Sequence, residues 1–202
     1  MQTFVATRGI PSLLHFTRLA NLPAILANGI VPRHTLIEGG VPFEHNDEIR
    51  LDGHQDASCF TIGWPNYKMF YTARCNNPGV KWAVIECSSS ILWEKDCIFS
   101  AENAASGTAR AVPDVVRRGV PGISAMYAET IGKPTRAEMG LPAHFPTNPQ
   151  AEVLVFGVVE PRYFLHVHID DWQSRQAFAA AHATLSFRGG WEGPRADYQH
   201  WR

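Results

Sequence analysis

An uncharged apolar run at residues 153–159 is the strongest structural signal in the chain. It is too short to span a bilayer, and valines lie on both sides of its Gly157, which is typical of a strand buried on both faces. Asn148 and Pro149, just before the run, favour a turn. The pattern therefore predicts a central strand entered from a loop, with one carboxylate, Glu152, at the rim of the sheet.

The rest of the chain mixes short strands with short helices. Apolar or alternating runs predict strands at residues 13–16, 30–32, 58–62, 81–87, 97–99, 163–169 and 185–187. Helical spacing predicts helices at residues 19–28, 67–74, 113–118, 123–131 and 172–182, with one helical turn at 88–92. Thr17 and Asp170 or Asp171 are candidate helix caps, and Trp64-Pro65-Asn66 would turn the chain into the helix at 67–74. Because no regular βαβ rhythm appears, the pattern favours an α+β fold.

Length and composition indicate one domain without a strongly charged surface. The chain has 202 residues, of which 45% are hydrophobic, and its formal net charge is −1. Such a balance excludes a general basic coat for nucleic acid, although it allows a local basic patch. The four cysteines form no C-x-x-C pair, and the first residues lack the pattern of a signal peptide. We therefore expect free thiols, a cytoplasmic location and no association with a membrane.

Two long segments favour function over disorder. Residues 33–56 form an expected polar loop that contains histidines, charged residues and Arg50. Residues 100–150, directly before Glu152, are rich in Gly, Pro and Ala. The basic residues of the second segment are Arg110, Arg117, Arg118, Lys133 and Arg136. On charge alone, these residues fit a solvated surface as well as a functional patch.

Common signatures of nucleotide, serine-hydrolase and metal sites are absent from the sequence. The chain has no G-x-G-x-x-G, Walker loop or G-x-S-x-G motif. His166 and His168 would share one face of a strand, but no third ligand follows at a persuasive spacing. We therefore expect no metal site.

A set of motifs along the chain resembles the DarT family of nucleic-acid ADP-ribosyltransferases, the toxins of toxin–antitoxin systems. The motifs are His15-Phe16-Thr17 followed by Leu22 and Ile25-Leu26, then Pro65-x-x-x-Met69-Phe70-Tyr71, and finally Gln150-Ala151-Glu152-x-Leu154-Val155. The resemblance runs from about residue 15 to 159 and is carried by the order and spacing of these motifs. It implies an ADP-ribosyltransferase-like split β-sheet with flanking helices, in one domain over residues 1–202.

The resemblance also implies roles for individual residues. Glu152 would be the catalytic glutamate, and Arg50 would be a second catalytic residue in an NAD-binding loop at about 33–56. His15, Phe16 and Thr17 would contact NAD, the substrate that supplies ADP-ribose. Tyr71 would stack on nicotinamide or pack its own helix. Residues of about 100–150 would form the loop that recognises the substrate, which we expect to be single-stranded DNA contacted by Trp64, Arg117 and Arg118.

The residue types suit this chemistry. Cleavage of the nicotinamide–ribose bond passes through an oxocarbenium-like state, and a carboxylate that bonds a ribose hydroxyl more strongly in that state lowers the barrier. Arg50 suits a phosphate or a base oxygen, because its guanidinium is a planar fork that stays protonated. Unpaired bases also avoid the cost of extrusion from a duplex.

Some alternatives remain open at this stage. The target could be RNA, such as messenger RNA, or the chain could be a non-catalytic module that binds NAD or nucleic acid. Residues 46–53 depart from thymidine-modifying members, which leaves thymine and guanine open as the target base. The resemblance further implies an antitoxin that removes ADP-ribose, such as a macrodomain protein.

Overall fold

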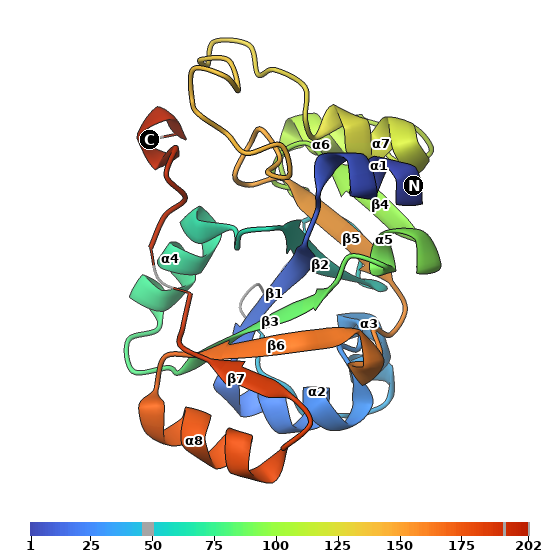
Figure 1. Cartoon of the computed structure of the whole chain (residues 1–202). Helices are drawn as coiled ribbons and strands as arrows, with labels where there is room; N and C mark the ends of the chain where they lie inside the picture. The colour runs from blue at the N-terminus through green and yellow to red at the C-terminus, as the bar shows by residue number, and fades with distance from the viewer. Residues whose placement is uncertain (46–50, 192, 202) are drawn as a thin grey trace.

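The computed structural model describes residues 1–45, 51–191 and 193–201. Its centre is a seven-stranded mixed sheet with the strand order β4-β5-β2-β1-β3-β6-β7, and helices pack around it (Figure 1). All the pairs are antiparallel except β6 with β7. The strands are β1 (Ser12–Arg18), β2 (Ala57–Ile62), β3 (Trp82–Ser88), β4 (Cys97–Ser100), β5 (Glu152–Phe156), β6 (Phe164–Ile169) and β7 (Ser186–Arg188).

The sheet is split between β1 and β2. These two strands pair at only two positions, Leu13 with Ile62 and Leu14 with Thr61, whereas β1 pairs with β3 along its whole length. Beyond Leu14 the two strands separate, as the blue β1 and the teal β2 show in Figure 1. The predicted α+β fold with a split sheet is therefore confirmed.

Short helices surround the sheet, and two of their predicted starts are confirmed. The helices are α1 (Gln2–Arg8), α2 (Leu22–Asn28), α3 (Arg33–Glu38), α4 (Tyr67–Asn76), α5 (Ile91–Glu94), α6 (Gly107–Ala111), α7 (Gly119–Ala125) and α8 (Trp172–Ala181), with 3-10 turns η1 (Leu19–Asn21), η2 (Pro161–Tyr163) and η3 (Tyr198–Trp201). Asn66 begins α4 by accepting the Met69 backbone N–H at 3.2 Å, and Asp171 begins α8 by accepting that of Ser174 at 2.8 Å.

Both faces of the sheet are buried. The larger core includes Leu13, Ile85 and Val167, and a smaller cluster of Leu14, Phe70, Trp82 and Val84 lies beneath α4. Full burial of an aliphatic side chain stabilises a fold by about 1.5–3 kcal/mol. The strands that frame the split are therefore held by packing as well as by backbone hydrogen bonds.

Several predicted elements differ from the structure. Thr17 lies inside β1 and does not begin a helix, and residues 33–56 contain the helix α3. The expected helices at 113–118 and 123–131 are replaced by α6 and α7. The strand predicted to reach residue 159 ends at Phe156, because Gly157 has a positive φ of 71° that breaks the extended backbone. The pattern also gave no sign of α1.

The C-terminal segment, residues 193–201, closes the molecule over the chain that precedes β5. It runs from β7 past α4 toward the orange loop before β5 (Figure 1). Arg195 is 3% exposed and donates to the carbonyls of Pro146 and Thr147 at 2.8 and 2.9 Å. Its guanidinium also bonds both carboxylate oxygens of Asp197, at 2.7 and 2.6 Å. Trp201 donates its indole N–H to the same carboxylate at 2.9 Å.

Candidate active site

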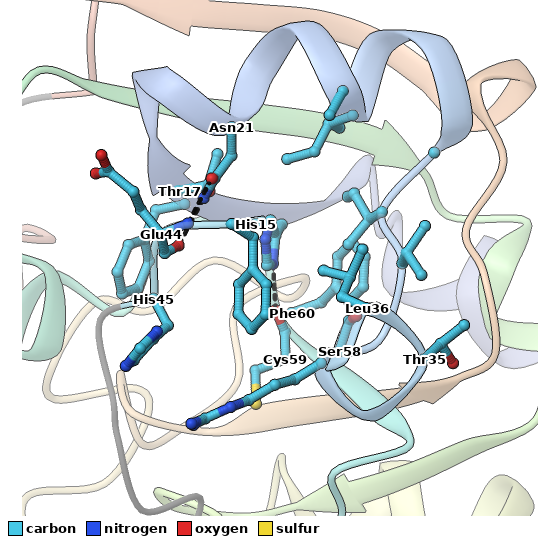
Figure 2. Close-up of a pocket in the computed structure, with 18 of the residues that line it drawn as sticks. His15, Thr17, Asn21, Thr35, Leu36, Glu44, His45, Ser58, Cys59 and Phe60 are labelled. Carbon is cyan, nitrogen blue, oxygen red and sulfur yellow. Dashed lines mark hydrogen bonds between the residues drawn. The ribbon is translucent and has the colours of Figure 1, made fainter. Parts of the chain in front are cut away.

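A cavity of about 530 Å³, which we call the first cavity, occupies the split in the sheet. Its walls come from β1, α2, α3, β2 and the segment 41–45, and Glu152 of β5 joins them. Figure 2 shows the close-up, with His15, Thr17, Asn21, Ser58 and Phe60 around the opening. Pockets of about 300–1,000 Å³ are typical of small-molecule and cofactor sites, so the first cavity suits a ligand of nucleotide size.

His15 joins the two strands where their backbone pairing ends. Its Nδ1 lies 2.9 Å from the carbonyl oxygen of Cys59 on β2, the dashed contact in Figure 2. Since a carbonyl can only accept, Nδ1 donates and carries the proton. The imidazole ring also packs against Phe60, with centroids 5.4 Å apart. His15 is therefore held in one orientation inside the cavity wall.

Thr17 and Asn21 fix the segment 41–45 over the cavity. Asn21 accepts the Glu44 backbone N–H at 2.9 Å and donates to the Glu44 carbonyl at 2.7 Å, as Figure 2 shows. The same amide donates to the hydroxyl of the buried Thr17 at 3.1 Å. Arg18 adds an ion pair with the Glu44 carboxylate at 3.2 Å. The end of β1 thus determines where this segment lies.

Glu152 is a buried carboxylate in the cavity wall. It is the first residue of β5, lies opposite Ser100 of β4 and is 4% exposed. Its Oε2 accepts the backbone N–H of Ala104 at 2.8 Å. Burial of a carboxylate is costly unless it is hydrogen-bonded, so this N–H both stabilises and orients it. The strand and the loop after β4 together position Glu152.

Four of the predicted NAD-site residues meet at this cavity. His15, Phe16, Thr17 and Glu152 all line it, although Glu152 comes more than a hundred residues later in the chain. Arg50, the other predicted catalytic residue, lies outside the described residues.

Two aromatic residues predicted to contact substrate lie elsewhere. Tyr71 is 63% exposed on α4 and does not line the cavity, because the inward face of that helix carries Met69 and Phe70. Trp64 packs between Phe145 and Trp191, with centroid distances of 6.2 and 5.3 Å.

The two arginines predicted to contact substrate are both paired with carboxylates. Arg117 is 7% exposed and bonds Asp114 at 2.6 Å, and Arg118 pairs with Asp96. Arg118 also lies over the ring of Phe156 at 5.3 Å. Their positive charge is largely balanced within the protein, which differs from the basic patch that the sequence allowed.

Other polar residues of the cavity were not predicted as site residues. They are Asn21, Asn28, Arg33, Thr35, Glu44, His45, Asp52, Ser58, Thr61, Asn66 and Asn103. The sequence placed the residues between 33 and 56 in the expected NAD-binding loop and Asn103 in the expected substrate loop, but it singled out none of them. Asn66 carried a signal only as a helix start, and a helix start need not face a cavity.

The histidine pair of β6 contributes to packing. His168 contacts the Glu86 carboxylate and the Gly189 carbonyl, each at 3.1 Å, and its ring stacks on Trp191. Burial raises the pKa of Glu86, but hydrogen bonds from His168 and Ser12 outweigh it, so the net pKa is below its usual value. Burial lowers the pKa of His166. No group of three or more metal-ligating side chains gathers among the residues the structure describes.

No helix in the described part of the chain combines the length and hydropathy needed to cross a membrane.

Solved structures with a similar fold come from Thermosipho africanus and Thermus sp. 2.9. Thermosipho africanus DarTG in complex with ADP-ribose matches 89% of this chain at a TM-score of 0.61 and 15% identity. The chain spans half of that protein's length. Thermus sp. 2.9 DarT in complex with NAD+ matches 91% of this chain and 98% of its own length, at a TM-score of 0.59 and 13% identity. At such low identity, these matches show the fold.

A further structure of the Thermus protein, in complex with ADP-ribosylated single-stranded DNA, covers 94% of this chain at a TM-score of 0.56 and 11% identity. Comparison with curated proteins finds no match by sequence. One family model, described as the single-stranded DNA thymidine ADP-ribosyltransferase DarT, matches residues 14–182. Because this match covers most of the chain, the chain belongs to the DarT family of single-stranded DNA thymidine ADP-ribosyltransferases.

Proposed function

We propose that the first cavity binds NAD and that Glu152 is the catalytic carboxylate for transfer of ADP-ribose to a base of single-stranded DNA. Family membership makes the chain an NAD-dependent DNA ADP-ribosyltransferase, and the proposal assigns this activity to particular side chains. One observation supports this proposal above all. His15 and Thr17 of β1 line the same nucleotide-sized cavity in the split sheet as Glu152 of β5, which lies far from them in the sequence.

The proposed reaction breaks one bond and makes one. The bond between nicotinamide nitrogen and the ribose anomeric carbon breaks, and its electron pair leaves with nicotinamide, which becomes neutral. A nucleophilic atom of the base attacks the same carbon, and the proton of the base passes to solvent. Glu152 stabilises the positive charge on the ribose by bonding a ribose hydroxyl. The reaction is therefore a glycosyl transfer.

The remaining roles concern binding. His15, Phe16 and Thr17 contact NAD, and the hydrogen bonds that orient the half-buried His15 and the buried Thr17 support this assignment. Arg50 keeps its proposed role in orienting NAD or the target base. The contacts of Arg117 and Arg118 with Asp114 and Asp96 argue against a main role for them in binding phosphates. Thymine is the proposed base, in line with the description of the family.

We also propose that the chain acts in the cytoplasm as the toxin of a toxin–antitoxin or phage-defence system. All four cysteines are free thiols, which fits a reducing compartment. Modification of the host's own DNA needs an antidote, and one of the similar structures is named DarTG, a protein of which this chain spans half the length. The proposed partner is an antitoxin that removes ADP-ribose, such as a macrodomain protein.

The test incubates the full chain with NAD and matched single-stranded DNA or RNA oligonucleotides, and reads the products by mass. We expect a mass gain of one ADP-ribose on DNA, and fragmentation identifies the base. Glu152→Gln, which keeps size and removes charge, should lower the rate about a hundred- to thousandfold, as loss of a transition-state electrostatic group commonly does. Gln173→Glu on the exposed face of α8 is the control.

Three outcomes would overturn parts of this proposal. A mass gain on RNA alone would mean that RNA, and not DNA, is the substrate. A mass gain on neither nucleic acid would favour a non-catalytic binding module. Full activity of Glu152→Gln would exclude the proposed mechanism.

A further inference from the structure

A second cavity of about 290 Å³ adjoins the first. Its lining residues are Phe16, Lys68, Met69, Thr72, Ala73, Asn76, Asn77, Asn103 and Gln150. Three of them, Phe16, Met69 and Asn103, also line the first cavity. The two spaces are therefore neighbours across a shared wall, and a ligand in one can approach a ligand in the other.

The second cavity lies beside the catalytic carboxylate. Gln150 precedes Glu152 by two residues, and Asn103 precedes Ala104, whose N–H donates to the Glu152 carboxylate. The acceptor in an ADP-ribosyl transfer must reach the ribose carbon that the carboxylate stabilises. A space that meets the NAD cavity next to Glu152 is in the right place for that acceptor.

The lining of the second cavity suits a nucleobase. Four carboxamides line it, from Asn76, Asn77, Asn103 and Gln150, and a carboxamide both donates and accepts hydrogen bonds, as the edge of a base requires. Its described lining contains no carboxylate, whereas Glu44, Asp52 and Glu152 line the first cavity. At 290 Å³ it lies at the small end of the range for ligand pockets, so it suits one planar ring system.

The aromatic wall of the second cavity is preformed. Phe16 stacks on Phe70, with ring centroids 4.8 Å apart and an interplanar angle of 28°. Aromatic side chains in such a wall can stack on unpaired bases.

The polar wall is also held in place. Asn77 accepts from Arg18 at 2.9 Å and donates to the Ala73 carbonyl at 2.8 Å. Lys68 donates to the carbonyl of Trp201 in the C-terminal segment. An ammonium has three donors, so Lys68 can hold this contact and still bind a phosphate.

We propose that the second cavity binds the acceptor base, that Asn103 and Gln150 recognise its edge, and that Lys68 contacts an adjacent phosphate. This inference rests on the proposed function and adds the specificity-determining residues of the same site. It also separates two roles along the chain, since Glu152 acts on NAD and the carboxamides act on DNA.

The test compares two rates in the full-length protein: nicotinamide release without DNA, which reports NAD cleavage, and ADP-ribose transfer to a single-stranded oligonucleotide. Gln150→Glu replaces a donor by an acceptor at nearly constant size. We expect the ratio of transfer to nicotinamide release to fall about ten- to hundredfold, the usual discrimination carried by a good base contact. Gln173→Glu makes the same change on α8 and should leave the ratio within about twofold.

A second variant protects the test from a folding defect. Thr72 is exposed on α4 and lines the second cavity but not the first, so Thr72→Tyr should fill the second cavity and lower the same ratio. If Gln150→Glu fails to fold, the ratio measured for Thr72→Tyr tests the inference. Unchanged ratios in the folded variants would overturn the inference while the proposed function stands. A wild-type protein that neither releases nicotinamide nor modifies DNA would overturn the proposed function itself.

Discussion

The two sides of the candidate active site are held together by different kinds of contact. The proposed NAD side is framed by β1, β2 and β5, whose backbones pair in a ladder and whose side chains are largely buried. The proposed DNA side includes residues 101–151, which contain only the two short helices α6 and α7 within a long irregular segment. Side-chain hydrogen bonds hold that segment, above all from Arg195 in the C-terminal segment and from Arg136 within the segment itself.

This difference determines which part of the site keeps its shape when the sequence changes and which part changes with it. Backbone ladder bonds do not depend on side-chain identity, so strands can keep a cavity's shape while the sequence drifts. The fold is indeed shared with structures at 11–15% identity. A segment held by particular side chains changes when those side chains change, which is a simple route to a new target base on a constant NAD site.

The largest expected effect breaks the support on the DNA side. Arg195→Ala would leave the buried Asp197 carboxylate without its cation, and loss of one partner of a buried pair costs about 3–5 kcal/mol. We therefore expect a fall of that size in the free energy of unfolding, measured in urea. Arg188→Ala, at an exposed position of β7, should change it by less than about 0.5 kcal/mol.

Arg195→Ala also tests whether Arg195 supports transfer to DNA more than it supports cleavage of NAD. Because Arg195 bonds Pro146 and Thr147, just upstream of Gln150, DNA transfer should fall more than nicotinamide release at a temperature where the variant is folded. Equal losses in both rates would mean that the DNA side depends on Arg195 no more than the NAD side does.

A smaller effect is expected from the NAD side. Asn21→Ala removes two hydrogen bonds to the Glu44 backbone, each worth about 0.5–1.5 kcal/mol. The segment 41–45 should then be less well placed over the first cavity, and the Kd for NAD should rise about five- to thirtyfold, as calorimetry can measure. Affinity for single-stranded DNA should change little. Tighter or unchanged NAD binding would show that this segment does not cover the ligand.

The smallest effect concerns a link between the two sides. Asp114 contacts Arg117 and His54, and His54 follows the segment that contains Arg50. Partial burial raises the pKa of Asp114, but the hydrogen bond from Arg117 and the nearby His54 outweigh it, so the net pKa lies below the ordinary 3.8. The link therefore stabilises the fold fully above pH 3.8 and is lost as pH falls through the lower, folded-state pKa.

An NMR titration of the Asp114 carboxyl carbon measures this directly. The midpoint should lie below 3.8 in the wild type and rise in His54→Ala. A wild-type midpoint above 3.8 would mean that burial raises the pKa of Asp114 by more than Arg117 and His54 lower it.

The sequence predicted the strands around the first cavity better than the elements of residues 101–151, and the reason is physical. Strands such as β3 and β5 carry dense local patterns, and the cap residues Asn66 and Asp171 act within three residues. These signals are local, so a window of sequence contains them. The family resemblance then brought His15 and Glu152 to one site, which periodicity alone could not do.

Sequence patterns say least where distant contacts decide the outcome. Arg118 carries a visible charge, but its partner Asp96 is 22 residues away and becomes a neighbour only in the fold. The helices α6 and α7 are short, and isolated short helices have little intrinsic stability, so tertiary contacts set their ends. The motif also left two roles open for Tyr71, because the outward face of α4 is determined by how Phe70 packs.

The split sheet also determines when the first cavity can form during synthesis of the chain on the ribosome. Its cavity needs β1, near the start of the chain, and β5, which is more than a hundred residues further on. Closing such a long loop is slow, and a nascent chain lacks Glu152 until β5 has been made. A chain that has been made only as far as β4 therefore has neither a closed first cavity nor the carboxylate that we propose as catalytic.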